Sequence, residues 1–152
     1  ATFPNARYII QRLEWEHFTR LEMRERPNVM NQLLPLESLG VLELREGDFD
    51  LTSEVKARVS AGHTPGHTTL DIESEGEKAF VFSDIAVHHV QLTEPDWFLQ
   101  FDAEPEAARK MRWEYFGRLA DEETLVLANH FPAPGYGYIV AEGGTWRWRP
   151  MK

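Results

Sequence analysis

A chain of 152 residues, 42% of them apolar, is long enough for one domain with one hydrophobic core. The formal net charge of -9 opposes binding to nucleic acid and to anionic membrane surfaces, which attract basic proteins. The sequence lacks a run of about 18 apolar residues, and the absence of cysteine excludes disulfides and thiolate ligands. We therefore expect a single domain over residues 1–152, a cytoplasmic location, and imidazole and carboxylate as the ligands of any metal.

The first part of the chain predicts a mixture of short elements. In chain order these are a strand at Ala6–Ile10, an amphipathic helix at Gln11–Arg24 closed by Pro27, a helical turn within Asn28–Leu39, and strands at Val41–Leu44 and Val55–Val59 joined by a turn at Glu46–Asp48. Helix and strand alternate from the start, which is typical of the α/β class.

Sheet dominates the rest of the chain. The expected strands are Thr68–Ile72, Lys78–Phe82 and Thr124–Ala128, followed by a closing hairpin of Gly137–Ala141 and Thr145–Arg149. One helix is expected at Glu104–Ala120, with Asp102 as its N-cap and an apolar stripe that includes Tyr115 and Phe116. The fold class is therefore predicted as α/β.

Three predicted strands are each followed by a residue that can bind a metal ion. His63 follows the strand at Val55–Val59, Asp84 follows the strand that ends at Phe82, and His130 follows the strand that ends at Ala128. Residues far apart in sequence that each follow a strand can meet at one rim of a sheet. This pattern makes His63, Asp84 and His130 candidate metal ligands.

The other readings of these residues are structural. A lone histidine is more often a satisfied structural group than a ligand, and Asp84 suits a loop cap as well as a ligand. Pro65 disfavours a helix through His63 and His67, so only one of the two needs to be a ligand. Two further histidines, at 88 and 89, either line a pocket or cap a turn.

Three sequence motifs, in this order, resemble the metallo-β-lactamase superfamily, and most closely its branch of methyl-parathion-hydrolase-like and quorum-quenching-lactonase-like proteins. The motifs are Gly62-His63-Thr64-Pro65-Gly66-His67-Thr68, then Phe82-Ser83-Asp84 with His88-His89, then Asn129-His130-Phe131-Pro132. The resemblance covers essentially the whole chain, including the Phe101–Glu106 segment.

The resemblance implies an αββα sandwich with a dinuclear metal site at one edge, and this chain supplies mainly the C-terminal half. It implies that His63 binds the first ion, that Asp84 bridges both, and that His130 binds the second, while His67 is a supporting or structural residue. The cofactors would be two divalent ions, with zinc expected first and manganese or iron as alternatives. The reaction would be cleavage of an ester, lactone or phosphoester by a metal-activated hydroxide.

The superfamily's upstream His-x-His-x-Asp-His motif is absent from this sequence. Three ligands shared by two ions are fewer than a catalytic zinc normally has, so we expect this chain alone to be inactive and to be the C-terminal part of a longer hydrolase. Its expected partners are a small-molecule substrate and either the missing N-terminal segment or a second copy in a homo-oligomer. The alternatives are a non-catalytic interaction module and an iron-dependent oxidoreductase on the same fold.

The sequence does not identify a substrate. His89 and Phe131 are candidates for a substrate pocket, and Trp97 and Phe98 are further candidates for its apolar wall, although aromatic residues near a site are as often part of the core. Trp146 and Trp148 of the closing hairpin suit either the core or an interface.

Overall fold

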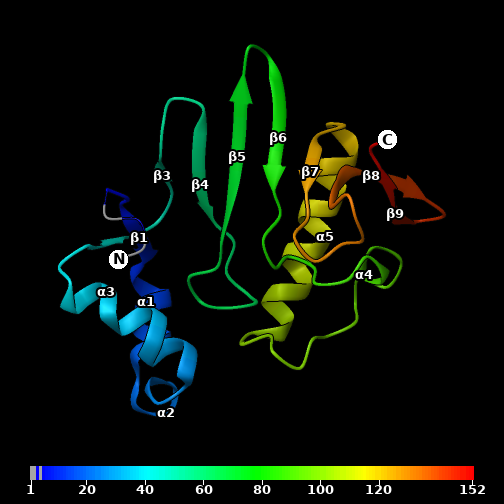
Figure 1. Ribbon diagram of the computed structural model, residues 1–152. Coiled ribbons are helices and arrows are strands. Elements are labelled where there is room, and N and C mark those ends of the chain that lie inside the picture. Colours follow the sequence, from blue (N-terminus) through cyan, green and yellow to red (C-terminus); the bar gives the residue numbers. More distant parts are fainter. Residues whose placement is uncertain (1–2, 4) are drawn as a thin grey trace. The chain divides into compact units, whose positions relative to one another are not determined.

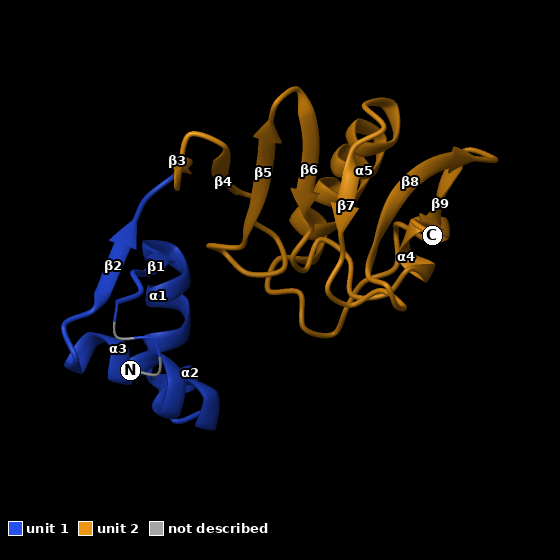
Figure 2. Cartoon of the chain, turned by 45° about the horizontal axis from the view of Figure 1, so that its top comes forward, with its two compact units in different colours: residues 1–47 blue, residues 48–152 orange. Residues whose placement is uncertain are grey.

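The computed structural model describes residue 3 and residues 5–152, and it divides the chain into two compact units, 1–47 and 48–152 (Figure 2). Each unit is described by itself. All three candidate metal ligands belong to the second unit. Among the described residues, no helix is both long enough and apolar enough to span a membrane.

The first unit pairs two short parallel strands and joins them through helices. Strand β1, Tyr8–Gln11, pairs with β2, Leu42–Arg45, with Tyr8 opposite Leu42. The connecting helices are α1 (Arg12–Thr19), α2 (Leu21–Arg24), the π-helix η1 (Val29–Leu33) and α3 (Leu34–Ser38). The ion pair between Arg7 and Glu43 ties the start of β1 to β2.

The prediction of one continuous helix over Gln11–Arg24 is wrong. Arg20 has φ -61° and ψ 154°, an extended conformation that separates α1 from α2. The hydroxyl of Thr19 donates a hydrogen bond of 2.7 Å to the carbonyl of Trp15, a local contact that commonly bends or ends helices. Neither helix contains a buried residue, so no apolar packing holds a longer helix together.

The second unit is a seven-stranded sheet in sequence order, with helices between its fourth and fifth strands (Figure 1). Its elements are β3 (Phe49–Asp50), β4 (Val55–Val59), β5 (Thr68–Ser74), β6 (Glu77–Val81), α4 (Val90–Thr93), α5 (Pro105–Asp121), β7 (Leu125–Leu127), β8 (Tyr136–Glu142) and β9 (Thr145–Pro150). Within this sheet, β6 and β7 are the only neighbouring strands that run parallel. The sequence had predicted these elements except for the short β3 and α4, and α5 agrees with the predicted helix.

Helix α5 packs against the sheet through aromatic side chains. Phe116 of α5 lies 5.9 Å, centroid to centroid, from Phe82 in a stacked arrangement and 5.4 Å from Trp146 in an edge-on one. Phe82 and Phe116 are completely buried, and each contributes about 1.5–3 kcal/mol through its burial. Trp146, which the sequence left undecided between core and interface, belongs to this core.

The strand directions explain where the candidate ligands lie. Strand β5 is antiparallel to both of its neighbours, β4 and β6, and β7 is parallel to β6. Strands β4, β6 and β7 therefore run in the same direction, so their carboxyl ends lie at one edge of the sheet. The loops that carry His63, Asp84 and His130 leave from that edge.

Candidate metal centre

Asp84 lies between the two histidines, and each histidine faces a different oxygen of its carboxylate. His63 Nε2 lies 3.7 Å from Oδ2, and His130 Nε2 lies 3.0 Å from Oδ1. The side chain of His63 is 19% exposed, that of Asp84 34% and that of His130 48%, so the cluster opens to solvent on the side of His130. The structure thus brings together the three residues that the sequence had selected.

The backbone before Asp84 is strained. Ser83 has φ 48°, in the left-handed region that non-glycine residues rarely adopt, at a cost of about 1–2 kcal/mol. The Ser83 hydroxyl donates a 2.8 Å hydrogen bond to the carbonyl of Thr68, which holds this turn against the start of β5. Strain of this kind is often found at functional sites, where it sets the direction of a side chain.

His67 supports the backbone of Asp84 and uses both of its ring nitrogens to do so. Its Nδ1 lies 3.0 Å from the carbonyl oxygen of Ser60 and 2.7 Å from the Ser60 hydroxyl, and its Nε2 accepts a 2.9 Å hydrogen bond from the amide of Asp84. Burial lowers the pKa of His67, which agrees with a neutral ring that accepts at Nε2. These contacts agree with the supporting role expected for His67, and that role stays a prediction.

Asp102 contacts His63, which the sequence pattern did not indicate. Its Oδ1 lies 3.0 Å from His63 Nδ1, and its Oδ2 accepts hydrogen bonds from the amide of Leu99 at 3.2 Å and from Arg112 Nη1 at 3.5 Å. Burial alone would raise the pKa of Asp102, but the hydrogen bonds from His63 and Leu99 and the charge of Arg112 bring it below its usual value. Asp102 is therefore a buried carboxylate that orients the ring of His63.

The prediction that Asp102 is the N-cap of the following helix is wrong. Glu104 occupies the N-cap position of α5 and makes no side-chain hydrogen bond there. The residue pattern suited a cap, but the carboxylate is turned toward His63 and the buried Arg112 instead. One signal in the sequence points to this pair: Arg112 is four residues from both Ala108 and Phe116, which places a charged residue on the apolar stripe of the helix.

The loop that carries His63 is held against the start of α5 by backbone contacts. The amides of Ala103 and Glu104 donate hydrogen bonds of 2.9 Å to the carbonyls of His63 and Gly62. Gly62 has φ 152°, and a Cβ atom there would lie 2.5 Å from the backbone nitrogen of Ala108. Only glycine allows this close approach, so Gly62 sets the position of the His63 loop.

The donor set suits divalent ions shared by one carboxylate. Two ligand atoms that each lie about 2.0–2.2 Å from the same tetrahedral ion are roughly 3.3–3.6 Å apart, close to the separations that Asp84 makes with His63 and His130. Oδ1 of Asp84 is buried and accepts no hydrogen bond from the described residues. Within the same residues, no group of three or more histidine, cysteine or acidic side chains is arranged to hold one ion. The two histidines face different oxygens of Asp84.

The predicted pocket residues lie side by side but differ in exposure. His89 is exposed; its ring stacks on that of His88 at 4.3 Å and meets the edge of Phe131 at 6.3 Å, centroid to centroid. Phe131 is buried against Phe82 and Trp148. Phe131 is therefore part of the core, and of the two predicted pocket residues only His89 is exposed.

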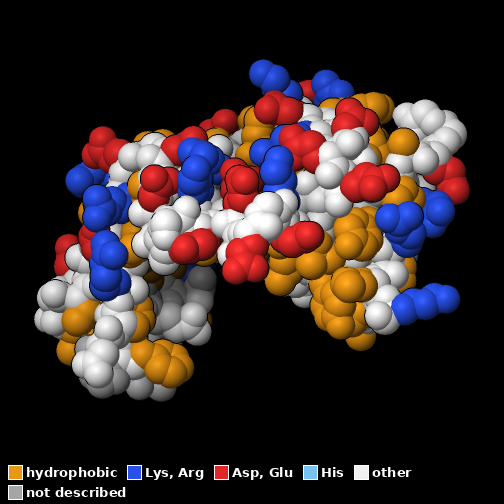
Figure 3. All heavy atoms as spheres, turned by 90° about the horizontal axis from the view of Figure 1, so that it is seen from above, with side chains coloured by type: hydrophobic (Ala, Val, Ile, Leu, Met, Phe, Trp, Pro, Cys, Tyr) orange, Lys and Arg blue, Asp and Glu red, His pale blue; other side chains and the backbone are white. Residues whose placement is uncertain are grey.

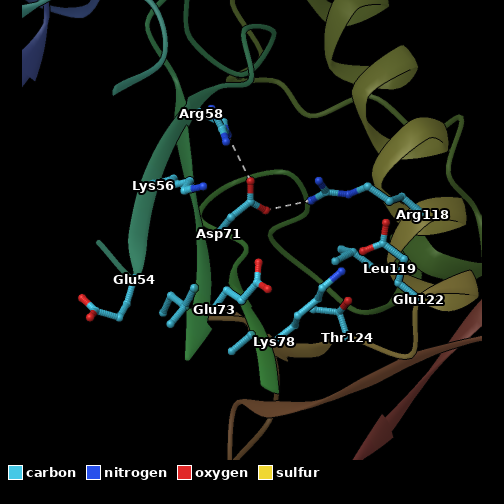
Figure 4. A pocket seen from close by; sticks show the side chains of 12 residues that line it. Glu54, Lys56, Arg58, Asp71, Glu73, Lys78, Arg118, Leu119, Glu122 and Thr124 are labelled. Carbon is cyan, nitrogen blue, oxygen red and sulfur yellow. Dashed lines mark hydrogen bonds and ion pairs between the residues drawn. The ribbon is translucent and has the colours of Figure 1, made fainter. Parts of the chain in front are cut away.

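A groove elsewhere in the second unit contains charges of both signs and has no part in the metal centre. Its charged lining residues are Lys56, Arg58, Lys78, Arg118, Glu54, Asp71, Glu73 and Glu122. Figure 4 shows Asp71 between Arg58 and Arg118, which donate hydrogen bonds of 3.2 and 3.3 Å to it. Acidic and basic side chains are also interspersed over the face seen in Figure 3. The four cations and four anions compensate one another, so the groove does not select a charged ligand.

Comparisons with known proteins identify the fold. No family model and no curated protein match the sequence. Among solved structures, AbOPH, a hydrolase in the beta-lactamase superfamily, matches 100% of this chain with a TM-score of 0.85 and 24% identity. AidC, a dizinc quorum-quenching lactonase, matches 99% with a TM-score of 0.82 and 25% identity. The chain has the metallo-β-lactamase fold.

A third structure, a probable metal-dependent hydrolase from Staphylococcus aureus, matches 100% of the chain with a TM-score of 0.78 and 23% identity. The chain spans only about half the length of these three proteins, 57%, 56% and 55% respectively. The resemblance to the superfamily and the predicted fold class are thus confirmed.

Proposed function

We propose that this chain contributes three ligands to the dinuclear metal centre of a hydrolase that cleaves an ester, lactone or phosphoester bond. The observation that carries the proposal is the position of Asp84, whose two carboxylate oxygens each face a histidine from a different strand end. A carboxylate with this surrounding can offer one oxygen to each of two cations. The solved structures described above, which include hydrolases and a dizinc lactonase, support the same reading.

Each residue has a defined part in this proposal. His63 would bind through Nε2, because its Nδ1 is engaged with Asp102. His130 would bind through Nε2 at the other oxygen of Asp84. Divalent ions held there would supply Lewis acidity, which activates water near neutral pH and polarises the bond under attack. Zinc is the ion expected first, since imidazole and carboxylate ligands suit it.

The three ligands also limit what the chain can do by itself. A catalytic zinc usually has three protein ligands of its own, whereas here three ligands would serve two ions. We therefore expect weak metal binding and little hydrolysis until further ligands complete the centre, either from a longer protein or from a partner subunit.

The test is the number of zinc ions bound per chain at equilibrium with excess free zinc, measured by equilibrium dialysis and elemental analysis so that weak binding is detected. The wild-type chain would be compared with the Asp84→Asn variant and with His17→Gln, which alters a histidine outside the cluster. We expect zinc in the wild type and in His17→Gln, and its loss in Asp84→Asn. Equal zinc content in all three proteins, or none in the wild type, would overturn the proposal.

Activity gives a second readout. Because little hydrolysis is expected of the chain alone, it would be assayed with excess zinc and at high protein concentration. The substrates would be an acyl homoserine lactone, an aryl ester and an aryl phosphotriester, which represent the three bond types proposed. Turnover lost on adding a chelator and restored by zinc would support a metal-dependent hydrolase, and the preferred substrate would give the bond type.

A further inference from the structure

Arg112 is a charged residue in the middle of the buried face of α5. Its side chain is completely buried, and its donors reach three separate acceptors. Nε donates to the carbonyl of Pro95 at 2.9 Å, Nη2 to the carbonyl of Trp97 at 3.0 Å, and Nη1 to Asp102 Oδ2 at 3.5 Å. Arg112 therefore links the helix to two points of one loop and to the carboxylate that contacts His63.

Stability alone does not account for this arrangement. Removing a guanidinium from water is costly, and burial lowers the pKa of Arg112 accordingly. Buried ion pairs can often be replaced by apolar side chains of similar volume without loss of stability. A helix stripe that already contains Phe116 and Leu119, both completely buried, would accept an apolar residue at this position. A role in the site is the better explanation.

The loop from Glu94 to Glu104 is fixed at several points around this arginine. Besides the carbonyls of Pro95 and Trp97, the amide of Leu99 is bound by Asp102, and the amide of Ala103 is bound to the carbonyl of His63. The contacts to Asp102 and Ala103 reach both the ring and the backbone of His63. A change at Arg112 would therefore affect His63 through Asp102 and through the loop backbone.

We propose that Arg112 is a positioning residue for the metal centre: by clamping the loop at Pro95 and Trp97 and holding Asp102, it keeps His63 protonated at Nδ1 with Nε2 directed at Asp84. This inference rests on the proposed function for its consequence, which is metal affinity. A carboxylate partner on the far nitrogen of a histidine ligand fixes the tautomer and the orientation of the ring. Arg112 acts one step further out, on the carboxylate.

The test compares three variants of the chain. Arg112→Met removes the charge and all three donors, and Arg112→Lys keeps the charge but cannot reach all three acceptors. The matched control is Arg109→Met on the same helix. Arg109 also contacts the loop, through Asp96, but its ion pairs with described residues are with the exposed Asp96 and Glu106. Zinc affinity would be measured by competition with a chromophoric chelator, and the His63 tautomer of the metal-free chain by ¹⁵N NMR.

We expect Arg112→Met to weaken zinc binding about 10- to 100-fold, the range for loss of a group that supports a metal ligand. Arg112→Lys should fall between Arg112→Met and the wild type, and Arg109→Met should match the wild type. The wild-type His63 ring should be protonated at Nδ1, and this preference should weaken in Arg112→Met. Unchanged affinity and tautomer in a folded Arg112→Met protein would overturn the inference and leave the proposed function intact.

Two further outcomes remain decisive. If Arg112→Met does not fold, Asp102→Asn replaces it, since the amide has the same shape but lacks the charge that holds Arg112. A zinc affinity of Asp102→Asn equal to that of the wild type would then overturn the inference. If the wild type itself binds no zinc, the proposed function fails. The positioning role of Arg112 would then stand or fall on the His63 tautomer alone.

Discussion

His63 and His67 lie four residues apart in one loop, and their surroundings give them different roles. Both nitrogens of His67 are used by protein groups, Ser60 on one side and the amide of Asp84 on the other. His63 contacts a buried carboxylate, Asp102, through Nδ1 and directs Nε2 toward the carboxylate of Asp84. The groups that contact the two ring nitrogens, more than burial or spacing, therefore distinguish a histidine that supports the backbone from one that can bind an ion.

The largest effect is expected at Asp84, which both candidate ligand histidines face. The variant Asp84→Asn keeps the shape and the backbone amide that binds His67, but it removes the negative charge between His63 and His130. We expect zinc affinity to fall by on the order of 100-fold or more, since even loss of a supporting partner costs 10- to 100-fold. Chelator competition measures this change. An Asn variant that binds zinc as tightly as the wild type would leave Asp84 as a loop cap.

The two histidines of the loop should respond differently to the same substitution. His63→Gln should weaken zinc binding by at least about tenfold with a small change in stability. His67→Gln should instead lower the free energy of unfolding by about 1–3 kcal/mol, because it disturbs buried hydrogen bonds. Urea unfolding of both metal-free proteins, together with chelator competition, gives the two quantities. The distinction between the histidines would fail if His67→Gln lost more zinc affinity than His63→Gln.

The convergence of the three ligands was predictable because it depends on strand direction. Buried apolar runs marked β6 and β7 in the sequence, and a strand pattern after a turn marked β4. Residues that follow strands running in the same direction meet at one edge of the sheet. Asp102 was not predictable in the same way. The pattern of Asp102 followed by Pro105 and Glu106 is equally typical of a helix start, and only the tertiary structure shows that its carboxylate turns toward His63.

The break at Arg20 was missed for a related reason. Apolar residues at near-helical spacing predicted one helix, but Leu21 is 87% exposed and contributes nothing to a core. Periodicity reports the spacing of apolar residues, and it does not report whether a partner surface covers them. In α5 the stripe is buried against the sheet, so there the same reasoning led to the correct helix.

A smaller effect is expected at Gly62, which places the His63 loop against α5. In Gly62→Ala the new methyl group would lie 2.5 Å from the nitrogen of Ala108, a backbone atom that cannot move aside without displacing the helix. We expect the free energy of unfolding to fall by about 1–3 kcal/mol, the usual cost of overpacking. The control is Gly76→Ala in the β5–β6 turn, where φ is 83° and no atom lies within 4 Å of the new methyl. Equal losses in the two variants would mean that φ alone, and not the contact with α5, constrains Gly62.

The smallest effect concerns the strain at Ser83, which directs Asp84 away from β6. Ser83→Ala and Ser83→Gly both remove the hydroxyl that binds the carbonyl of Thr68, so the difference between them reports the backbone alone. At φ 48° the glycine variant should be the more stable by about 1 kcal/mol, because a Cβ atom is disfavoured in the left-handed region. At an ordinary backbone position the order is reversed, since glycine loses more entropy on folding. Urea unfolding of the two metal-free variants shows directly which of them is the more stable. If the alanine variant is the more stable, Ser83 does not hold this conformation, and Asp84 is directed by the contact with His67 alone.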